Sequence, residues 1–334
     1  MFGSYKLGAC LPTFASCADR YCLSGYGRGE TTVEGMLAAA KKVDGLDGLE
    51  LVGNWHINDQ NIGKMTKLFR DNGLAIPMIV PDLWTQAKWG RGSLAAADAA
   101  TRTAAVAEVK KCMDWAAEAG CAFVDVWPGQ DGYDYPFEAD YSDAWKWMRD
   151  GVAQCAGHSK KVKVLVEYKL REPRNHCFLS SAAKAILLLQ GIPNTGCLLD
   201  VGHALAAGES MAEAVALLSD HGLLDYVHLN DNHRDWDDDL IPGTIHVPEF
   251  LELAYWLVRT GYKGWLTLDI FPYREEKIPA AVESFEWVRH LLTCVQDRGI
   301  DAINGIVRRG EGTDSVRLVR EMLGGKAPAG AKAR

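Results

Sequence analysis

The most constraining feature of this sequence is a recurrence in which a short apolar or β-branched run is followed by a stretch with the period of an amphipathic helix. Eight such runs occur, at residues 6–11, 49–53, 76–81, 123–127, 162–169, 197–201, 226–230 and 265–271. Strands that alternate with helices form parallel sheets, because a parallel pair needs a long crossover connection. The recurrence therefore predicts an α/β protein with eight parallel strands.

Eight parallel strands can close into a (β/α)8 TIM barrel, which removes both sheet edges and places the helices outside. Thr31 with Glu34 has capping-box spacing just before apolar periodicity and predicts a helix start. An open doubly wound sheet is the alternative, although no G-x-G-x-x-G turn follows the first strand. We expect one catalytic barrel domain over residues 1–300 and a C-terminal helical extension over residues 301–334, the last of them disordered.

The net charge and the lengths of the apolar runs indicate which kinds of partner this chain can bind. The net charge of -8 and the absence of a basic stripe argue against nucleic-acid binding, which relies on clustered Lys and Arg. The apolar runs are shorter than the ~20 residues needed to span a bilayer, and the N-terminus lacks a signal-peptide layout. We therefore expect a cytoplasmic protein with no nucleic-acid or membrane partner. Nine cysteines include no C-x-x-C pair, and most are expected to be buried apolar residues or inert loop thiols.

Ionisable side chains stand at the C-terminal ends of four consecutive predicted strands, which in a barrel share one mouth. These residues are Glu167, Asp200, His228 and Asp269. Their separations of 33, 28 and 41 residues are each about one βα repeat. Such groups are costly in an apolar strand unless they are paired or bound to a metal. Three carboxylates and one imidazole form a hard, oxygen-rich site, which favours Mn²⁺, or alternatively Mg²⁺ or Co²⁺, over metals that prefer thiolates.

A second set of ligand-type residues follows closely in the sequence. His203 lies three residues after Asp200, and the pair Asp237 and Asp239 follows His228 after a short gap. These side chains predict a second cation site beside the first. The alternative is a solvated acidic loop, which is the commoner fate of such a run.

Aromatic residues are concentrated in two predicted loops, residues 82–93 and 128–141. Loops that follow barrel strands lie on the catalytic face, and ligand pockets are commonly lined by aromatic groups. The candidate wall residues are Trp84, Trp89, Trp127, Tyr133 and Tyr135. The alternative is that they pack the loops onto the barrel rim.

Taken together, these residues resemble the xylose isomerase and L-rhamnose isomerase superfamily. Members of that superfamily build a two-cation site from a strand-five Glu with a Lys two residues on, a strand-six carboxylate with a His three residues on, a strand-seven ligand, a D-x-D pair and a strand-eight Asp. The matching residues are Glu167, Lys169, Asp200, His203, His228, Asp237, Asp239 and Asp269. The histidine at strand seven is more similar to the rhamnose isomerase branch, because the xylose branch has a carboxylate there.

The resemblance implies a metal-dependent aldose–ketose isomerase that acts on a small monosaccharide and assembles as a dimer or tetramer. The loops after the seventh and eighth predicted strands contain no phosphate-gripping Gly-rich segment or Arg/Lys cluster, so we expect the sugar to be unphosphorylated. It implies two Mn²⁺-type sites and catalytic roles for Lys169, His56, Glu167 and Asp269. His56 has an Asp three residues later, the spacing of the ring-opening pair of the xylose branch; an ordinary surface histidine is the alternative. Arg174, beyond Lys169, is a candidate substrate ligand and keeps an acidic substrate open.

Other functions remain open on the same barrel. A ketose 3-epimerase uses one metal and two carboxylates, but usually has Glu where this chain has Asp269. The metal-binding subunit of a C-glycoside deglycosidase would need a small β-rich partner chain. An endonuclease for abasic DNA would need three zinc ions and a basic face, which the negative net charge disfavours. A barrel without enzymatic activity is the last alternative.

Overall fold

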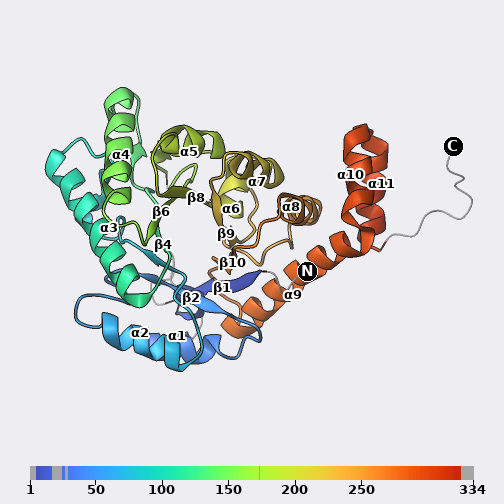
Figure 1. Ribbon diagram of the computed structural model, residues 1–334, viewed down its shortest axis with the longest axis horizontal. Coiled ribbons are helices and arrows are strands. Elements are labelled where there is room, and N and C mark those ends of the chain that lie inside the picture. The colour runs from blue at the N-terminus through green and yellow to red at the C-terminus, as the bar shows by residue number, and fades with distance from the viewer. Residues whose placement is uncertain (1–4, 17–24, 27–28, 173, 325–334) are drawn as a thin grey trace, which may run out of the picture.

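The computed structural model describes residues 5–16, 25–26, 29–172 and 174–324. Its main sheet is a closed barrel of eight parallel strands in the order β1-β10-β9-β8-β6-β4-β3-β2, which confirms the predicted TIM barrel (Figure 1). The barrel strands are β1 (Lys6–Cys10), β2 (Gly48–Val52), β3 (Met78–Val80), β4 (Phe123–Val126), β6 (Lys163–Glu167), β8 (Thr195–Asp200), β9 (Leu224–Leu229) and β10 (Trp265–Leu268). The C-terminal residues predicted to be disordered lie outside the described part of the chain.

Helices surround the barrel, and two more follow at the C-terminal end of the described chain (Figure 1). They are α1 (Val33–Ala40), α2 (Ile62–Asp71), α3 (Ala99–Ala119), α4 (Tyr141–Ala156), α5 (Ala182–Leu189), α6 (Val201–Ala206), α7 (Met211–Asp220), α8 (Val247–Thr260), α9 (Lys277–Arg298), α10 (Ile300–Arg309) and α11 (Gly312–Met322). Helix α1 begins one residue later than predicted: Thr32, rather than Thr31, caps it by accepting the Gly35 N–H at 3.1 Å. Among the described helices, none is both long and apolar enough to cross a membrane.

The lower part of the barrel interior is filled by an apolar layer. Its buried members are Met78, Leu165, Leu198, Tyr226 and Trp265. Successive strand residues point to opposite faces, so the residue two positions later points inward again. Leu165 is thus followed by Glu167, and Tyr226 by His228, on the inner face. The strands therefore place a polar layer directly above an apolar one, towards the carboxyl ends where barrel active sites lie.

Two further elements lie outside the barrel. A short antiparallel pair, β5 (Gly132–Tyr133) and β7 (His176–Cys177), joins the loops after β4 and β6 at the catalytic end. Helices α10 and α11 lie beyond the end of α9, away from the ring of helices (Figure 1). Buried Ile303 and Leu318, together with a 2.8 Å hydrogen bond from Tyr255 Oη to Asn304 Oδ1, attach this extension to α8.

Candidate metal centre

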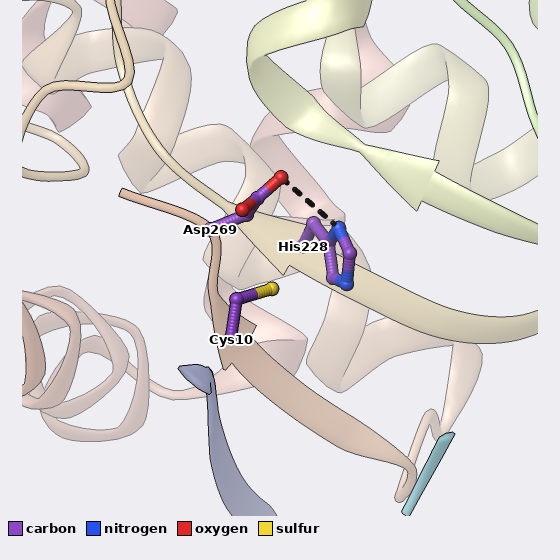
Figure 2. Close-up of side chains that lie close together, drawn as sticks. All are labelled: Cys10, His228 and Asp269. Carbon is purple, nitrogen blue, oxygen red and sulfur yellow. Dashed lines mark ion pairs between the residues drawn. The ribbon is translucent and has the colours of Figure 1, made fainter. Parts of the chain in front are cut away.

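The four ionisable strand-end residues predicted as ligands come together at the barrel mouth. One ligand atom from each of Glu167, Asp200, His228 and Asp269 lies within 4.8 Å of all the others. His228 Nδ1 is 3.6 Å from Asp269 Oδ2, 3.7 Å from Asp200 Oδ2 and 3.8 Å from Glu167 Oε1. The contact with Asp269 is drawn in Figure 2. Consecutive strands thus bring four potential ligands together at one point.

The donor atoms of this cluster fit a divalent cation. His228 Nδ1 is buried and lacks a hydrogen-bond partner among the described residues, a rare condition for buried polar atoms. Buried Glu167 Oε1 also lacks a hydrogen bond there, although it lies 3.1 Å from His203 Nδ1. Asp200 is held rigidly, because Oδ1 accepts the His203 N–H at 2.8 Å and Oδ2 accepts from Asn230 Nδ2 at 2.9 Å. Burial raises the pKa of Asp269 to about 7, and the charges of Asp200 and Glu167 add to this effect. A cation would satisfy the orphaned atoms and compensate the crowded negative charge.

Glu50, on β2, is a member of the site that was not predicted from the sequence. Both of its carboxylate oxygens lie 3.1 Å from His228 Nε2, and the side chain is 2% exposed. A carboxylate accepts the proton of Nε2, which leaves Nδ1 directed towards the four-residue cluster. Burial would lower the pKa of His228, but the negative charges of Glu50 and Glu167 raise it well above its usual value.

Asp125 and Cys10 also belong to this region and were not predicted. Asp125, on β4, is fully buried, and neither carboxylate oxygen has a hydrogen-bond partner among the described residues. Burial and the nearby charge of Glu167 raise its pKa well above the usual value. Cys10, at the end of β1, donates its S–H to Glu50 Oε2 at 3.2 Å. The signal for all three residues was a polar side chain within or at the end of a predicted strand.

The second predicted set of ligands lies on the wall of the same site. His203 Nε2 is 3.3 Å from Asp237 Oδ2, and Asp237 Oδ2 is 2.7 Å from Lys169 Nζ. Lys169 also pairs with Glu172, and its ammonium lies 5.2 Å from the centroid of the Trp127 ring. Burial would lower the pKa of Lys169, but these carboxylates raise it well above its usual value.

The four-residue cluster and the second predicted set of ligands differ in the groups that their side chains contact. Within the described part of the chain, the groups of three or more ligand-type residues within 4.8 Å do not include His203, Asp237 or Asp239. Asp237 is neutralised by the Lys169 ammonium, and Asp239 takes a left-handed backbone conformation with φ of 52°.

A cavity of about 400 Å³ opens above these residues. Of the predicted wall residues, Trp84 and Trp127 line it, with ring centroids 5.1 Å apart in an edge-to-face arrangement. Trp55 and Trp236 extend the wall. Trp89 is fully buried and does not line this cavity, so packing of the rim accounts for its position.

Four other predicted residues lie away from this cavity. Tyr133 and Arg174 line a neighbouring cavity of about 350 Å³, and Tyr135 is exposed. Arg174 is mostly exposed and pairs with Asp134 at 2.7 Å. His56 is buried, and its Nδ1 accepts the Val52 N–H at 2.9 Å.

The side chains of His56 and Asp59, the predicted ring-opening pair, bond to different parts of the protein. Asp59 bonds to Trp115 Nε1 at 2.8 Å and to Lys111 Nζ at 2.7 Å, towards the outer helices. His56 instead bonds to its own strand end and contacts the ring of Trp55.

The fold and the cluster together define a TIM barrel with a candidate metal centre at the carboxyl ends of its strands. More specifically, the chain belongs to the xylose isomerase-like TIM barrel family, whose model it matches over residues 37–291. The matched region contains every residue of the four-ligand cluster.

Two curated xylose isomerases are similar to this chain in sequence. Xylose isomerase from Thermus thermophilus is 25% identical over 226 residues, covering 65% of this chain and 58% of that protein. Xylose isomerase from Bacillus subtilis is 28% identical over 199 residues, covering 56% of this chain and 44% of that protein. The chain thus spans about half the length of these curated relatives.

Among solved structures, a D-tagatose 3-epimerase-like protein superimposes with a TM-score of 0.68 and 19% identity, covering 88% of this chain and 99% of that one. An L-ribulose 3-epimerase gives a TM-score of 0.69 and 18% identity, covering 88% and 96%. At these identities the likeness shows the shared fold.

Proposed function

We propose that this chain is a divalent-metal-dependent aldose–ketose isomerase that acts on a small, unphosphorylated monosaccharide. The observation that supports this most is that the Lys169 ammonium lines one aromatic-walled cavity together with Glu167, His228 and Asp269 of the four-ligand cluster. The cavity volume is within the usual range for small-molecule sites. Among its described lining residues Lys169 is the only Lys or Arg, and its charge is balanced by Asp237 and Glu172, which favours a neutral sugar over a phosphorylated one.

The residues that would hold the principal cation are Glu167, Asp200, His228 and Asp269, and oxygen-rich ligands favour Mn²⁺, Mg²⁺ or Co²⁺. When bound, such a cation supplies Lewis-acid polarisation of the substrate carbonyl. Glu50 would keep the Nε2 proton of His228 and so fix the orientation of the ring. His203, Asp237 and Asp239 remain the proposed ligands of a second cation, which Asp237 can serve only by giving up its ion pair with Lys169.

Lys169 would act on the substrate directly. Its ammonium would donate a hydrogen bond to the sugar oxygen that gains negative charge as hydrogen moves between C1 and C2. Asp237 and Glu172 would hold the ammonium in place, while the face of Trp127 limits its movement. Trp84 and Trp127 would pack against the C–H groups of the sugar and exclude water.

A panel of aldoses and ketoses, assayed with Mn²⁺ and with EDTA, tests the proposal. We expect one pair to interconvert with Mn²⁺ and to stop with EDTA. Lys169→Met should lower turnover by about 10²–10³-fold while the four-residue cluster still retains Mn²⁺. Lys163→Met is the matched control, because Lys163 lies on β6, the strand that leads to Lys169, but pairs with Asp225, outside the cavity lining. A Mn²⁺-loaded protein that forms no aldose from any ketose would contradict the proposal.

A ketose 3-epimerase is the second candidate, and one observation favours it. Asp237 is occupied by Lys169, so the four-residue cluster provides ligands for one cation, as that reaction requires. The products separate the candidates: a ketose substrate gives an aldose with an isomerase and a second ketose with an epimerase. With either activity we expect a dimer or tetramer, which sedimentation analysis of the intact chain would measure.

A further inference from the structure

The metal centre contains two overlapping groups of ligand-type residues rather than one. Both groups contain His228 and Asp269. The first adds Glu167 and Asp200, whereas the second adds Cys10 from the end of β1, with the three ligand atoms again within 4.8 Å of one another. Figure 2 shows the Cys10 sulfur directed towards the His228 ring.

The surroundings of Cys10 leave its sulfur accessible to a ligand. The residue is half-buried, its thiol is free, and it lines the cavity. Its S–H donates to Glu50 Oε2 at 3.2 Å, so its hydrogen bond does not occupy the sulfur lone pairs. His228 is 3% exposed, and its Nδ1 has no hydrogen-bond partner among the described residues. A buried imidazole that has one unpartnered nitrogen therefore lies close to the Cys10 sulfur and the Asp269 carboxylate.

We propose that Cys10, His228 and Asp269 form an alternative site for a thiophilic divalent cation such as Zn²⁺ or Cd²⁺. Sulfur, imidazole nitrogen and carboxylate oxygen are all ligands of Zn²⁺, and three protein ligands leave a fourth position open towards the cavity. On binding, the Cys10 S–H bond breaks, the sulfur electron pair forms the bond to the cation, and the proton leaves to solvent. The proton on His228 Nε2 stays in place and continues to form its hydrogen bond with Glu50.

The two groups share two residues, so one cation excludes the other. A hard cation would sit towards Glu167 and Asp200, and a thiophilic cation towards Cys10. Zn²⁺ or Cd²⁺ would therefore displace Mn²⁺ and stop turnover. That effect on turnover rests on the proposed function, whereas the binding of a cation by sulfur does not.

X-ray absorption on the full chain loaded with one equivalent of Zn²⁺ reads the sulfur ligand directly. We expect a sulfur neighbour at about 2.3 Å in the wild type, and its loss in Cys10→Ser. Cys294→Ser is the matched control, because Cys294 is also half-buried but lies on α9, outside the cavity lining. Cys10→Ala replaces Cys10→Ser if circular dichroism shows that the serine variant does not fold.

Competition between cations gives a second measurement. We expect Cys10→Ser to weaken Cd²⁺ binding by about tenfold or more while Mn²⁺ affinity changes by less than about threefold. A wild-type spectrum without sulfur, a sulfur signal that persists without Cys10, or an unchanged Cd²⁺ affinity would overturn the inference. In each of those cases Mn²⁺ binding and turnover could remain intact, so the proposed function would survive. Conversely, sulfur-bound Zn²⁺ in a protein without isomerase or epimerase activity would support this inference and refute the proposed function.

Discussion

Two adjacent layers of the barrel interior, built from the same strands, have opposite chemistry. The lower layer is apolar and consists of Met78, Leu165, Leu198, Tyr226 and Trp265. The upper layer carries Glu50, Asp125, Glu167 and His228, of which Glu167 and His228 stand two residues after Leu165 and Tyr226 of the lower layer. Two residues correspond to a rise of about 6.6 Å along a strand. The barrel interior therefore changes from apolar to ionisable side chains between one layer and the next.

The difference between the layers shows where stability and function are placed. The lower layer is built mainly from apolar side chains, and the hydroxyl of its Tyr226 accepts a hydrogen bond from Thr267 Oγ1 at 2.8 Å. In the upper layer, burial and mutual repulsion raise the pKa of Asp125, and the same causes raise that of Asp269 at the mouth. Such groups are unfavourable to folding unless a ligand compensates them. We therefore expect substitutions in the two layers to separate stability from metal binding.

Asp269→Ala gives the largest expected effect on the polar side of this comparison. Removing one of four ligands should abolish metal retention and lower turnover by about 10³-fold or more. The metal-free variant should remain folded, because the lower layer is untouched. Metal analysis of the purified protein and progress curves measure both effects, with exposed Asp235→Ala as the control. A fully active, metal-free Asp269→Ala protein would refute the proposed role of the cluster.

Leu198→Ala tests the apolar layer. Truncating this fully buried leucine should lower the free energy of unfolding by about 2–5 kcal/mol. Mn²⁺ stoichiometry should stay unchanged in the folded protein. Urea titration and metal analysis measure the two quantities. Leu187→Ala, at a position 62% exposed, is the control and should change stability by less than about 0.5 kcal/mol. If Leu198→Ala loses its metal as well, the two layers are not independent.

The same comparison shows what could be predicted from the sequence. Glu167, Asp200, His228 and Asp269 were predictable, because barrel strands end at one mouth and each residue stands at such an end. Glu50 and Asp125 were not, because β2 and most of β4 are buried on both faces, so burial does not alternate along the strand to mark the inward-facing residues. Only the register of neighbouring strands shows that Glu50 faces His228 from across the barrel.

Outside the barrel interior, local sequence signals were less decisive. Trp89 has the same loop context as Trp84, yet Trp89 is fully buried and Trp84 lines the cavity. Loop conformation separates them, and it depends on contacts such as the bonds from Ser93 to Asp131, which lies 38 residues away. Cys10 was missed because a thiol among apolar residues is more often a packing residue than a ligand.

Glu50→Gln sharpens the comparison by removing one charge from the polar layer without changing its shape. The amide oxygen can still accept the His228 Nε2 proton, but a neutral partner makes the ring a weaker ligand. We expect Mn²⁺ affinity to fall by about 10–100-fold, with little change in the stability of the metal-free protein. Calorimetric titration of Mn²⁺ into the EDTA-treated chain measures this. An affinity equal to that of the wild type would show that Glu50 does not position His228.

His56 gives the smallest expected effect and tests how far the polar layer extends. Burial lowers its pKa to about 4, so the folded protein keeps the ring neutral while the unfolded chain takes up a proton near pH 6.5. Stability should therefore fall as the pH drops below about 6.5, and between pH 7 and pH 5 this residue should account for about 2 kcal/mol of the loss. His56→Gln should remove that part of the pH dependence in urea titrations.

The same variant separates the two interpretations of His56. If the residue only bonds to its strand end, turnover of His56→Gln at pH 7 should stay within about threefold of the wild type, because its ring lies outside the cavity lining. Asp59→Asn is the matched control, since its partners Lys111 and Trp115 lie on α3. A joint loss of turnover in both variants would instead support the predicted ring-opening pair and extend the catalytic region beyond the polar layer.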